Sequence, residues 1–342
     1  MTRFFLGSLN VEGPYFHATG EGLTTCAMNE ETGEITRVGA CALAQNAIWL
    51  ARAGEALLVA GENYLNPGTL AAFSQNGSSI GHAQSSLGGA ACHIAVASDA
   101  RTAFVASYLG GITVHALDPS GAVAPAHQHI TYPGRGARPA RQDKSHPHQS
   151  ALTPDRSHLL VCDLGCDRIW AHAFDGTRLG EPQAIAVSPG SGPRHLAIHP
   201  TLPRFYLLGE LDAKLRLFEG SGADWREIAV YTTLPEAFIG EPAGAAVKFH
   251  PSGKTLFVSN RHSDTITCFA VDARGNLAHA ATFAGQGQTP RDIALSPSGR
   301  WLIAVNQDSH ILVPFELDPT SGMPTGKTGP AFACGSPFCA LF

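Results

Sequence analysis

The sequence predicts an all-β protein, a seven-bladed β-propeller that forms one domain over residues 1–342. Three observations lead to this prediction. A strand–turn–strand unit recurs six times, its copies follow one another at steps of 46 to 56 residues, and the two chain ends supply the parts of a seventh copy.

The recurring unit is a short apolar run, a tight turn and a second apolar run that ends in a polar residue. Its copies end at residues 62, 108, 164, 210, 261 and 307, so the successive steps are 46, 56, 46, 51 and 46 residues. Repeats of this length with about four strands each are typical of propeller blades. The six copies span 46–62, 92–108, 148–164, 194–210, 245–261 and 291–307.

The apolar runs predict strands because they are short, rich in Val, Ile, Leu, Phe and Ala, and bounded by Pro, Ser, Asp and Gly. The segments between paired runs predict tight turns, as in SDAR (98–101), TPDR (153–156), PSGK (251–254) and PSGR (297–300). Third strands are predicted at 111–117, 167–174, 214–219 and 264–271, and looser polar segments complete each unit.

The chain ends predict how the ring closes. The C-terminal SPFCALF (336–342) resembles an opening strand without a partner, and the N-terminal RFFLGSL (3–9) resembles a second strand without a first. Joining them gives a seventh unit with a step of (342 − 307) + 9 = 44 residues, in line with the others. Closure of this kind leaves no long sheet edge exposed, which disfavours the alternatives of an open all-β array or two sandwiches.

Composition excludes several classes of function. The chain has 23 basic and 28 acidic side chains, a net charge of -5, which gives no reason to expect binding to nucleic acid or an anionic membrane. No apolar run approaches the ~18 residues needed to cross a bilayer, and MTRFFLGSLN has no signal-peptide pattern. We expect a cytoplasmic protein. The sequence leaves its oligomeric state open.

The cysteines and histidines predict neither a metal site nor a disulfide framework. The eight cysteines form no CxxC pair and several lie in apolar runs, which favours buried reduced thiols. The sixteen histidines show no HExxH spacing. We therefore expect no metal ion and no organic cofactor.

The repeat register predicts where a functional site lies. Because the first two strands of a blade are antiparallel, residues that begin the first strand and end the second meet at one mouth of the central channel. These residues are unusually ionic for a chain with 15% charged residues, and arginines suit a carboxylate or phosphate. A small anionic substrate is therefore expected. The set comprises His93, His148, Arg194, Arg291 and Asp292 at strand starts, and Glu62, Tyr108, Asp163, Glu210, Asn260, Arg261 and Gln307 at strand ends.

Two rim loops accompany this mouth. The 56-residue step marks a basic insertion within 133–149, which brings Arg141 and His146 close to the predicted mouth. The 51-residue step carries the segment 234–244. Polar residues at equivalent blade positions also form structural networks in WD-type propellers, so each residue taken singly fits either role. The chemical variety of the strand ends (Glu, Tyr, Leu, Glu, Arg and Gln) favours a binding site.

Five stretches carry a family resemblance: SHPHQSALTPD, LLVCDLGCDRI, GPRHLAIHP, LFVSNRHSDTI and TPRDIALSPSGRWLIAVNQDS. With them the sequence resembles the seven-bladed propeller lactonase family, which includes propeller-type 6-phosphogluconolactonases and the fungal 3-carboxy-cis,cis-muconate lactonizing enzyme. The likeness runs from about residue 90 to the C-terminus. It implies a polar cluster at the channel mouth that acts on a lactone or its ring-opened acid, and the matching positions are His148, Arg194, Glu210 and Arg261, all within the set above.

The expected activity is hydrolysis of a small anionic lactone, 6-phosphogluconolactone foremost. Glu210 or His148 would activate water, and Arg194 and Arg261 would hold the carbonyl oxygen and the anionic group. Two alternatives remain: a cycloisomerase that closes a carboxymuconate to a lactone, and a non-catalytic propeller that binds proteins through its rim. Substrate-binding roles are expected for His93, Tyr108, Arg141, His146, Asp163, Asn260, Arg291 and Gln307.

Overall fold

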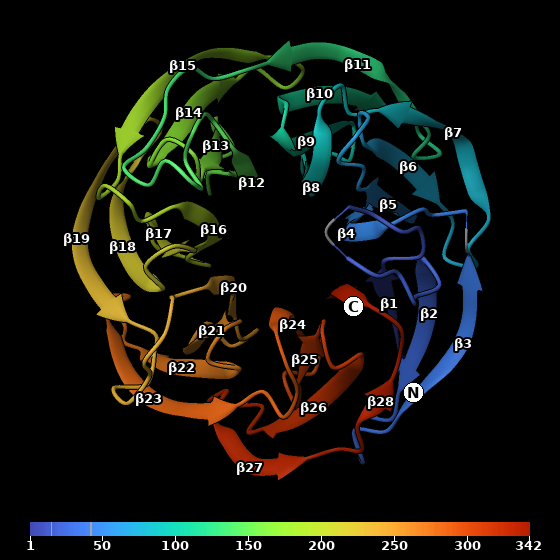
Figure 1. Ribbon diagram of the computed structural model, residues 1–342, viewed down its shortest axis with the longest axis vertical. Coiled ribbons are helices and arrows are strands. Elements are labelled where there is room, and N and C mark those ends of the chain that lie inside the picture. Colours follow the sequence, from blue (N-terminus) through green and yellow to red (C-terminus); the bar gives the residue numbers. More distant parts are fainter. Residues whose placement is uncertain (15, 42) are drawn as a thin grey trace.

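Seven β-sheets form a closed ring around a central channel in the computed structural model of the protein (Figure 1). The structure describes residues 1–14, 16–41 and 43–342. Every regular element in these residues is a β-strand. No helix long and apolar enough to cross a membrane is found among them. The prediction of a seven-bladed all-β propeller is confirmed.

The innermost strand of each blade contacts the innermost strands of its two neighbours, so seven strands surround the channel. Five of them are the first strands of predicted units, and a sixth, β8, begins three residues before its unit. These strands are β4 (Ala47–Ala53), β8 (Gly89–Val96), β12 (Pro147–Leu152), β16 (Pro193–Ile198), β20 (Gly244–Phe249), β24 (Pro290–Leu295) and β29 (Pro337–Leu341).

The second strands are buried almost throughout, because both faces of each blade are covered by neighbouring blades. This burial explains their continuous apolar sequences, such as ALLVAG and WLIAVN. The second strands are β1 (Thr2–Ser8), β5 (Ala56–Gly61), β9 (Thr102–Leu109), β13 (His158–Asp163), β17 (Arg204–Gly209), β21 (Thr255–Asn260) and β25 (Trp301–Asn306).

The outer two strands of each blade become progressively more exposed and more polar. The third strands are β2 (Leu23–Met28), β6 (Thr69–Phe73), β10 (Gly111–Leu117), β14 (Arg168–Phe174), β18 (Lys214–Ser221), β22 (Thr265–Val271) and β26 (Ile311–Leu317). The outermost are β3 (Ile35–Cys41), β7 (Ser79–Ser85), β11 (Val123–Ile130), β15 (Leu179–Ala186), β19 (Asp224–Thr232), β23 (Leu277–Ala284) and β27 (Pro324–Thr328), and the short β28 (Phe332–Ala333) also pairs with β26.

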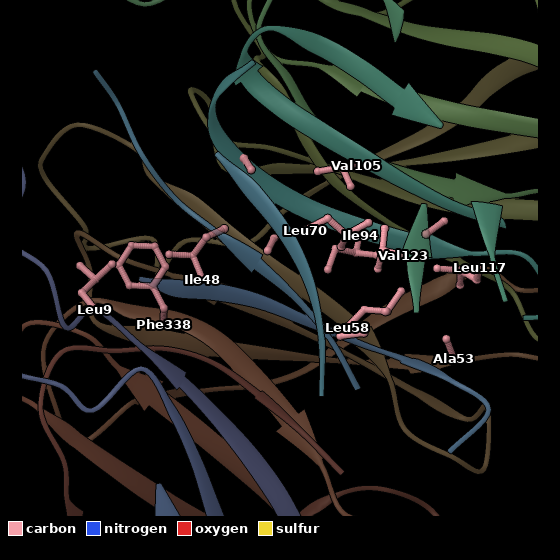
Figure 2. Close-up of a cluster of buried hydrophobic side chains, with 14 residues drawn as sticks. Leu9, Ile48, Ala53, Leu58, Leu70, Ile94, Val105, Leu117, Val123 and Phe338 are labelled. Carbon is pink, nitrogen blue, oxygen red and sulfur yellow. The ribbon is translucent and has the colours of Figure 1, made fainter. Parts of the chain in front are cut away.

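The hydrophobic core lies between adjacent blades. Figure 2 shows one such layer, in which Leu58 and Leu70 of one blade pack with Ile94 and Val105 of the next. Burial of apolar surface of this kind is the main favourable term in folding, and here every blade needs both neighbours to complete it.

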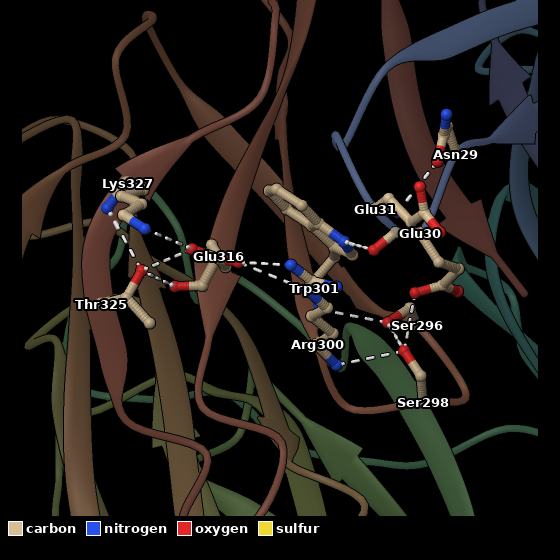
Figure 3. Close-up of polar contacts among 10 residues, drawn as sticks. All are labelled: Asn29, Glu30, Glu31, Ser296, Ser298, Arg300, Trp301, Glu316, Thr325 and Lys327. Atoms are coloured by element: carbon tan, nitrogen blue, oxygen red, sulfur yellow. Dashed lines mark hydrogen bonds and ion pairs between the residues drawn. The ribbon is translucent and has the colours of Figure 1, made fainter.

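The ring closes within one blade, as predicted. The C-terminal β29 pairs antiparallel with the N-terminal β1, with Leu341 opposite Phe5. At the adjoining seam, the indole N–H of Trp301 donates to the carbonyl oxygen of Glu30 at 2.9 Å, and Ser298 donates to the Glu30 carboxylate at 2.6 Å (Figure 3). These bonds tie the last complete blade to the closing blade.

All eight cysteines lie in the described segments as free thiols; five are buried, and Cys41, Cys92 and Cys334 are half-buried.

Candidate active site

A β-bulge near the start of the inner strands places the candidate residues. In β12, Pro147 pairs with Asp163 and Gln149 with Cys162, so the ladder skips His148. The same irregularity skips Arg194 in β16 and Arg291 in β24. A bulge turns a side chain away from the regular alternation, and bulges are common beside active sites. The equivalent residues of three other blades are Ile48, Cys92 and Phe338, and all six line one small chamber at the channel mouth.

The second strands contribute the residues at their ends. The residue after β5 is Glu62, the residue after β17 is Glu210 and the residue after β21 is Arg261. The backbone N–H of Glu62 donates to the carbonyl of Asn46, and that of Glu210 donates to Gly192, which holds both residues at the mouth. The two sets of residues therefore converge from several blades.

The converging side chains line a cavity of about 590 Å³, which suits a small-molecule ligand. Eight of the twelve residues proposed from the sequence line it or the small chamber beneath it: His148, Arg194, Glu210, Arg261, Tyr108, Arg141, His146 and Arg291. The loop 234–244 contributes no residue to the lining among the described residues.

Glu210 is the centre of an arginine cluster. Its Oε2 lies 3.0 Å from Nε of Arg194 and 3.0 Å from Nη2 of Arg261, and its Oε1 is paired with Arg141. Burial alone would raise the pKa of Glu210, but Arg261, Arg194 and Arg141 together hold it well below the usual range. The carboxylate is therefore ionised, with both oxygens occupied.

The arginines differ in what surrounds them. Arg194 is buried and also donates to the carbonyl of Ala245, so its guanidinium is fixed behind the cavity wall. Arg291 lies with its guanidinium over the ring of Phe338, 4.1 Å from the centroid. Among residues 1–14, 16–41 and 43–342, no carboxylate lies within ion-pair distance of Arg291. Its charge faces the cavity and the small chamber.

His148 is a neutral imidazole at the junction of the cavity and the chamber. Burial lowers the pKa of His148 well below the usual range, and the nearby Arg194 lowers it further. Its Nδ1 has no hydrogen-bond partner among the residues that the structure describes. The ring is thus available to a ligand.

One wall of the cavity is aromatic. The rings of Tyr108 and His146 stack with centroids 4.1 Å apart, and His146 Nδ1 lies 2.9 Å from the carbonyl oxygen of Tyr108. His146 Nε2 lies 3.0 Å from a carboxylate oxygen of Asp143, which orients the ring. These contacts give the insertion 133–149 a fixed position beside the mouth.

The sequence places Glu62 at a strand end, but the substrate-binding and catalytic residues predicted from it do not include Glu62. It is 8% exposed and lines both the cavity and the chamber, and its Oε2 has no hydrogen-bond partner in the described part of the chain. Burial raises the pKa of Glu62 to about 7, against the opposing effects of Arg291 and of a hydrogen bond with Tyr64. Glu62 occupies the same position in its repeat as Glu210, and this equivalence is the feature of the sequence from which its place in the site could be predicted.

Two expected residues face away from the cavity. Asp163 and Asn260 each precede the strand-end position by one residue, and successive side chains of a strand point to opposite faces. Asp163 accepts from the indole of Trp170 at 2.9 Å, and Asn260 bonds to Thr233. Asp163 thus bonds within its own blade and Asn260 bonds to the segment that follows β19 of the preceding blade, so the expectation that they bind substrate is not supported.

Two more expected residues lie outside the lining. His93 is one residue past the bulge, where it packs on Trp49 with ring centroids 4.3 Å apart, and Cys92 takes the position that His93 was expected to fill. Gln307 donates to its neighbour Asp308 at 3.0 Å and does not line the cavity. We leave both out of the proposed site.

Comparison with known proteins shows the family of the chain. Residues 10–342 match the model of the family described as "Lactonase, 7-bladed beta-propeller", and the chain belongs to that family. Family membership and the site together support a lactonase-type enzyme that acts on a small substrate.

Particular relatives carry more specific names. The chain is 29% identical to the 6-phosphogluconolactonase of Bacillus subtilis over 235 residues, which cover 68% of this chain and 67% of the relative. The solved structure of a periplasmic gluconolactonase from Pseudomonas aeruginosa has a TM-score of 0.90 and 26% identity, covering 100% of this chain and 99% of that one. A structure of a protein from Lactobacillus plantarum is similar at a TM-score of 0.90 and 26% identity, over 99% and 98% of the two chains.

Proposed function

We propose that the protein hydrolyses a small anionic lactone, with 6-phosphogluconolactone as its substrate. The observation that carries this proposal is the guanidinium of Arg291, which faces the cavity without a carboxylate partner among the described residues. Such a group binds phosphate or carboxylate through paired N–H donors. The name of the Bacillus subtilis relative supports the choice of a phosphorylated sugar lactone.

Glu210 serves in this proposal as the organiser of the cluster. Because its two oxygens are held by Arg141, Arg194 and Arg261, it is a poor acceptor for a further proton. It instead fixes Arg261 in the cavity wall, where the guanidinium would stabilise the oxyanion formed at the lactone carbonyl. The neutral His148 would donate a hydrogen bond to the same oxygen.

We assign this activity to the cytoplasm, a proposal supported by the eight free thiols, since disulfides are rare in reducing compartments.

A panel of substrates tests the proposal. Acid release from 6-phosphogluconolactone and from gluconolactone, and loss of the diene absorbance of 3-carboxymuconate, are measured with the purified protein. We expect kcat/KM to be highest for the phosphorylated lactone. Arg291→Gln should raise KM for that lactone by about 10- to 100-fold, the loss of one charge-assisted contact, and change KM for gluconolactone by less than about threefold.

Three results would contradict the proposed hydrolysis, its substrate or the role of Arg291. Rates equal to spontaneous hydrolysis with both lactones would overturn the proposal. Turnover of 3-carboxymuconate alone would favour the cycloisomerase, and equal effects of Arg291→Gln on both lactones would remove Arg291 from phosphate binding. Lys254→Gln, at an exposed turn between β20 and β21, is the control for removing a positive charge from the surface.

A further inference from the structure

Glu62 and Glu210 occupy equivalent positions in two blades but have opposite environments. Both follow the end of a second strand, and both are buried. Three guanidinium groups hold Glu210, whereas Glu62 has one carboxylate oxygen without a hydrogen-bond partner in the described segments. A buried carboxylate oxygen that faces a cavity is suited to accept a hydrogen bond from a ligand or water.

A small chamber lies beneath the main cavity. It has a volume of about 20 Å³, enough for one water molecule, and Arg194 and His195 are among the polar residues of its wall. Four residues line both the chamber and the cavity and therefore mark the boundary between them: Glu62, Cys92, His148 and Arg291. A water held at this boundary would lie between the Glu62 carboxylate and a lactone in the cavity.

We propose that Glu62 is the general base that activates this water, an inference that rests on the proposed lactone hydrolysis. The water oxygen forms a bond to the lactone carbonyl carbon as its proton passes to the Glu62 carboxylate. The ring C–O bond then breaks, and the leaving ring oxygen takes the proton back from Glu62. One water is consumed, the product is the hydroxy acid, and its ionisation in solvent releases the acid that is measured.

The groups around Glu62 fit this role. Arg291 faces it from β24, Tyr64 from the following loop and Cys92 from β8. Burial outweighs the attraction of Arg291, so the pKa of Glu62 is raised to about 7, close to the value at which a base works best in neutral solution. The thiol of Cys92 stays protonated because burial raises its pKa to about 12.

The test compares Glu62→Gln and Glu62→Asp with the wild type over pH 5 to 8, on 6-phosphogluconolactone with the spontaneous rate subtracted. For the wild type, kcat/KM should fall as pH drops below about 7, because the base becomes protonated. Glu62→Gln should lower kcat by at least about 100-fold and lose this pH dependence. KM should not rise, since removing a negative charge beside Arg291 favours an anionic substrate. Glu62→Asp should keep the pH dependence at a reduced rate.

The matched control is Glu55→Gln. Glu55 lies at the opposite end of the same strand pair, is exposed and bonds to Gln75, so this variant should follow the wild type at every pH. Affinity for 6-phosphogluconate, measured by calorimetry, reports whether Glu62→Gln retains its cavity, and it should stay within about threefold of the wild type or increase. If Glu62→Gln does not fold, the rate and pH profile of Glu62→Asp test the role of Glu62. A wild-type rate for Glu62→Asp would then contradict that role.

The outcomes separate the two proposals. A wild type that does not accelerate lactone hydrolysis overturns the proposed function and this inference with it. An active wild type together with a Glu62→Gln variant that keeps kcat within about threefold, or keeps the same pH midpoint, overturns only the role of Glu62 and returns the base to His148.

Discussion

The charge state of a buried carboxyl group depends on its neighbours, and Glu62 and Glu210 show both extremes in one cavity. Guanidinium groups hold Glu210 ionised, and burial favours the neutral form of Glu62. Sequence register brought Arg194, Glu210 and Arg261 together because Arg194 begins a first strand and the other two end second strands, all at the same mouth of the channel. It did not distinguish Glu62 from Glu210, since that difference depends on Arg141 from the insertion and Arg261 from the next blade as well as on Arg194 of the same blade.

Glu62 also predicts a dependence of stability on pH. Its pKa is raised from 4.5 to about 7 on folding, so the folded state binds more protons than the unfolded state between these values. The contribution of Glu62 to stability should therefore decrease as pH rises from about 4.5 to about 7. Glu62→Gln should lack this decrease. Its free energy of unfolding should therefore increase by ~3 kcal/mol relative to that of the wild type over this pH range, about 1.4 kcal/mol per pH unit.

Urea unfolding of both proteins at pH 4.5, 6 and 8 measures this difference. Glu55→Gln, which alters an exposed carboxylate, should parallel the wild type. Parallel curves for Glu62→Gln and the wild type would show that folding does not raise the pKa of Glu62.

The β-bulges of the inner strands determine which side chains reach the site. Repeat spacing located the strand starts correctly, but a bulge shifts the alternation by one residue. Asp163 and Asn260 point away from the cavity because each lies one residue before its strand-end position. The bulge is the reason that Cys92 rather than His93 faces the cavity. Apolar pattern alone does not specify such a shift, because it depends on backbone pairing with the second strand.

The turns between first and second strands give a separate prediction. Gly253 and Gly299 occupy the same turn position with φ of 71° and 73°, where Ala100 and Arg156 adopt similar angles in other blades. A Cβ at Gly253 would meet Pro200 at 3.5 Å, an ordinary contact, whereas one at Gly299 would meet His250 Nε2 at 2.6 Å.

Gly253→Ala should therefore lower the free energy of unfolding by ~1 kcal/mol, which is the penalty of a left-handed conformation for alanine. Gly299→Ala should lower it by clearly more, because the His250 side chain must move as well. Thermal unfolding measures the difference, and equal losses or the reverse order would contradict it. Neither variant should alter KM, since these turns lie at the end of the strands opposite the cavity.

Closure of the ring brings the side chains of the site together. The cavity takes side chains from six blades that are far apart in sequence, from Glu62 to Arg291. The blade number and the pairing of β29 with β1 were predictable because each chain end lacked a partner within its own repeat. The pairing of Arg141 with Glu210 was not, because it depends on how the insertion 133–149 folds over the mouth.

A crystal structure with bound 6-phosphogluconate tests the central claim most directly. The product should occupy the 590 Å³ cavity, with an anionic group on Arg291 and its newly formed carboxylate between Arg261 and the boundary marked by Glu62 and His148. Product bound on the outer strands, or in the cavity without contact to Arg291 and Arg261, would contradict the account.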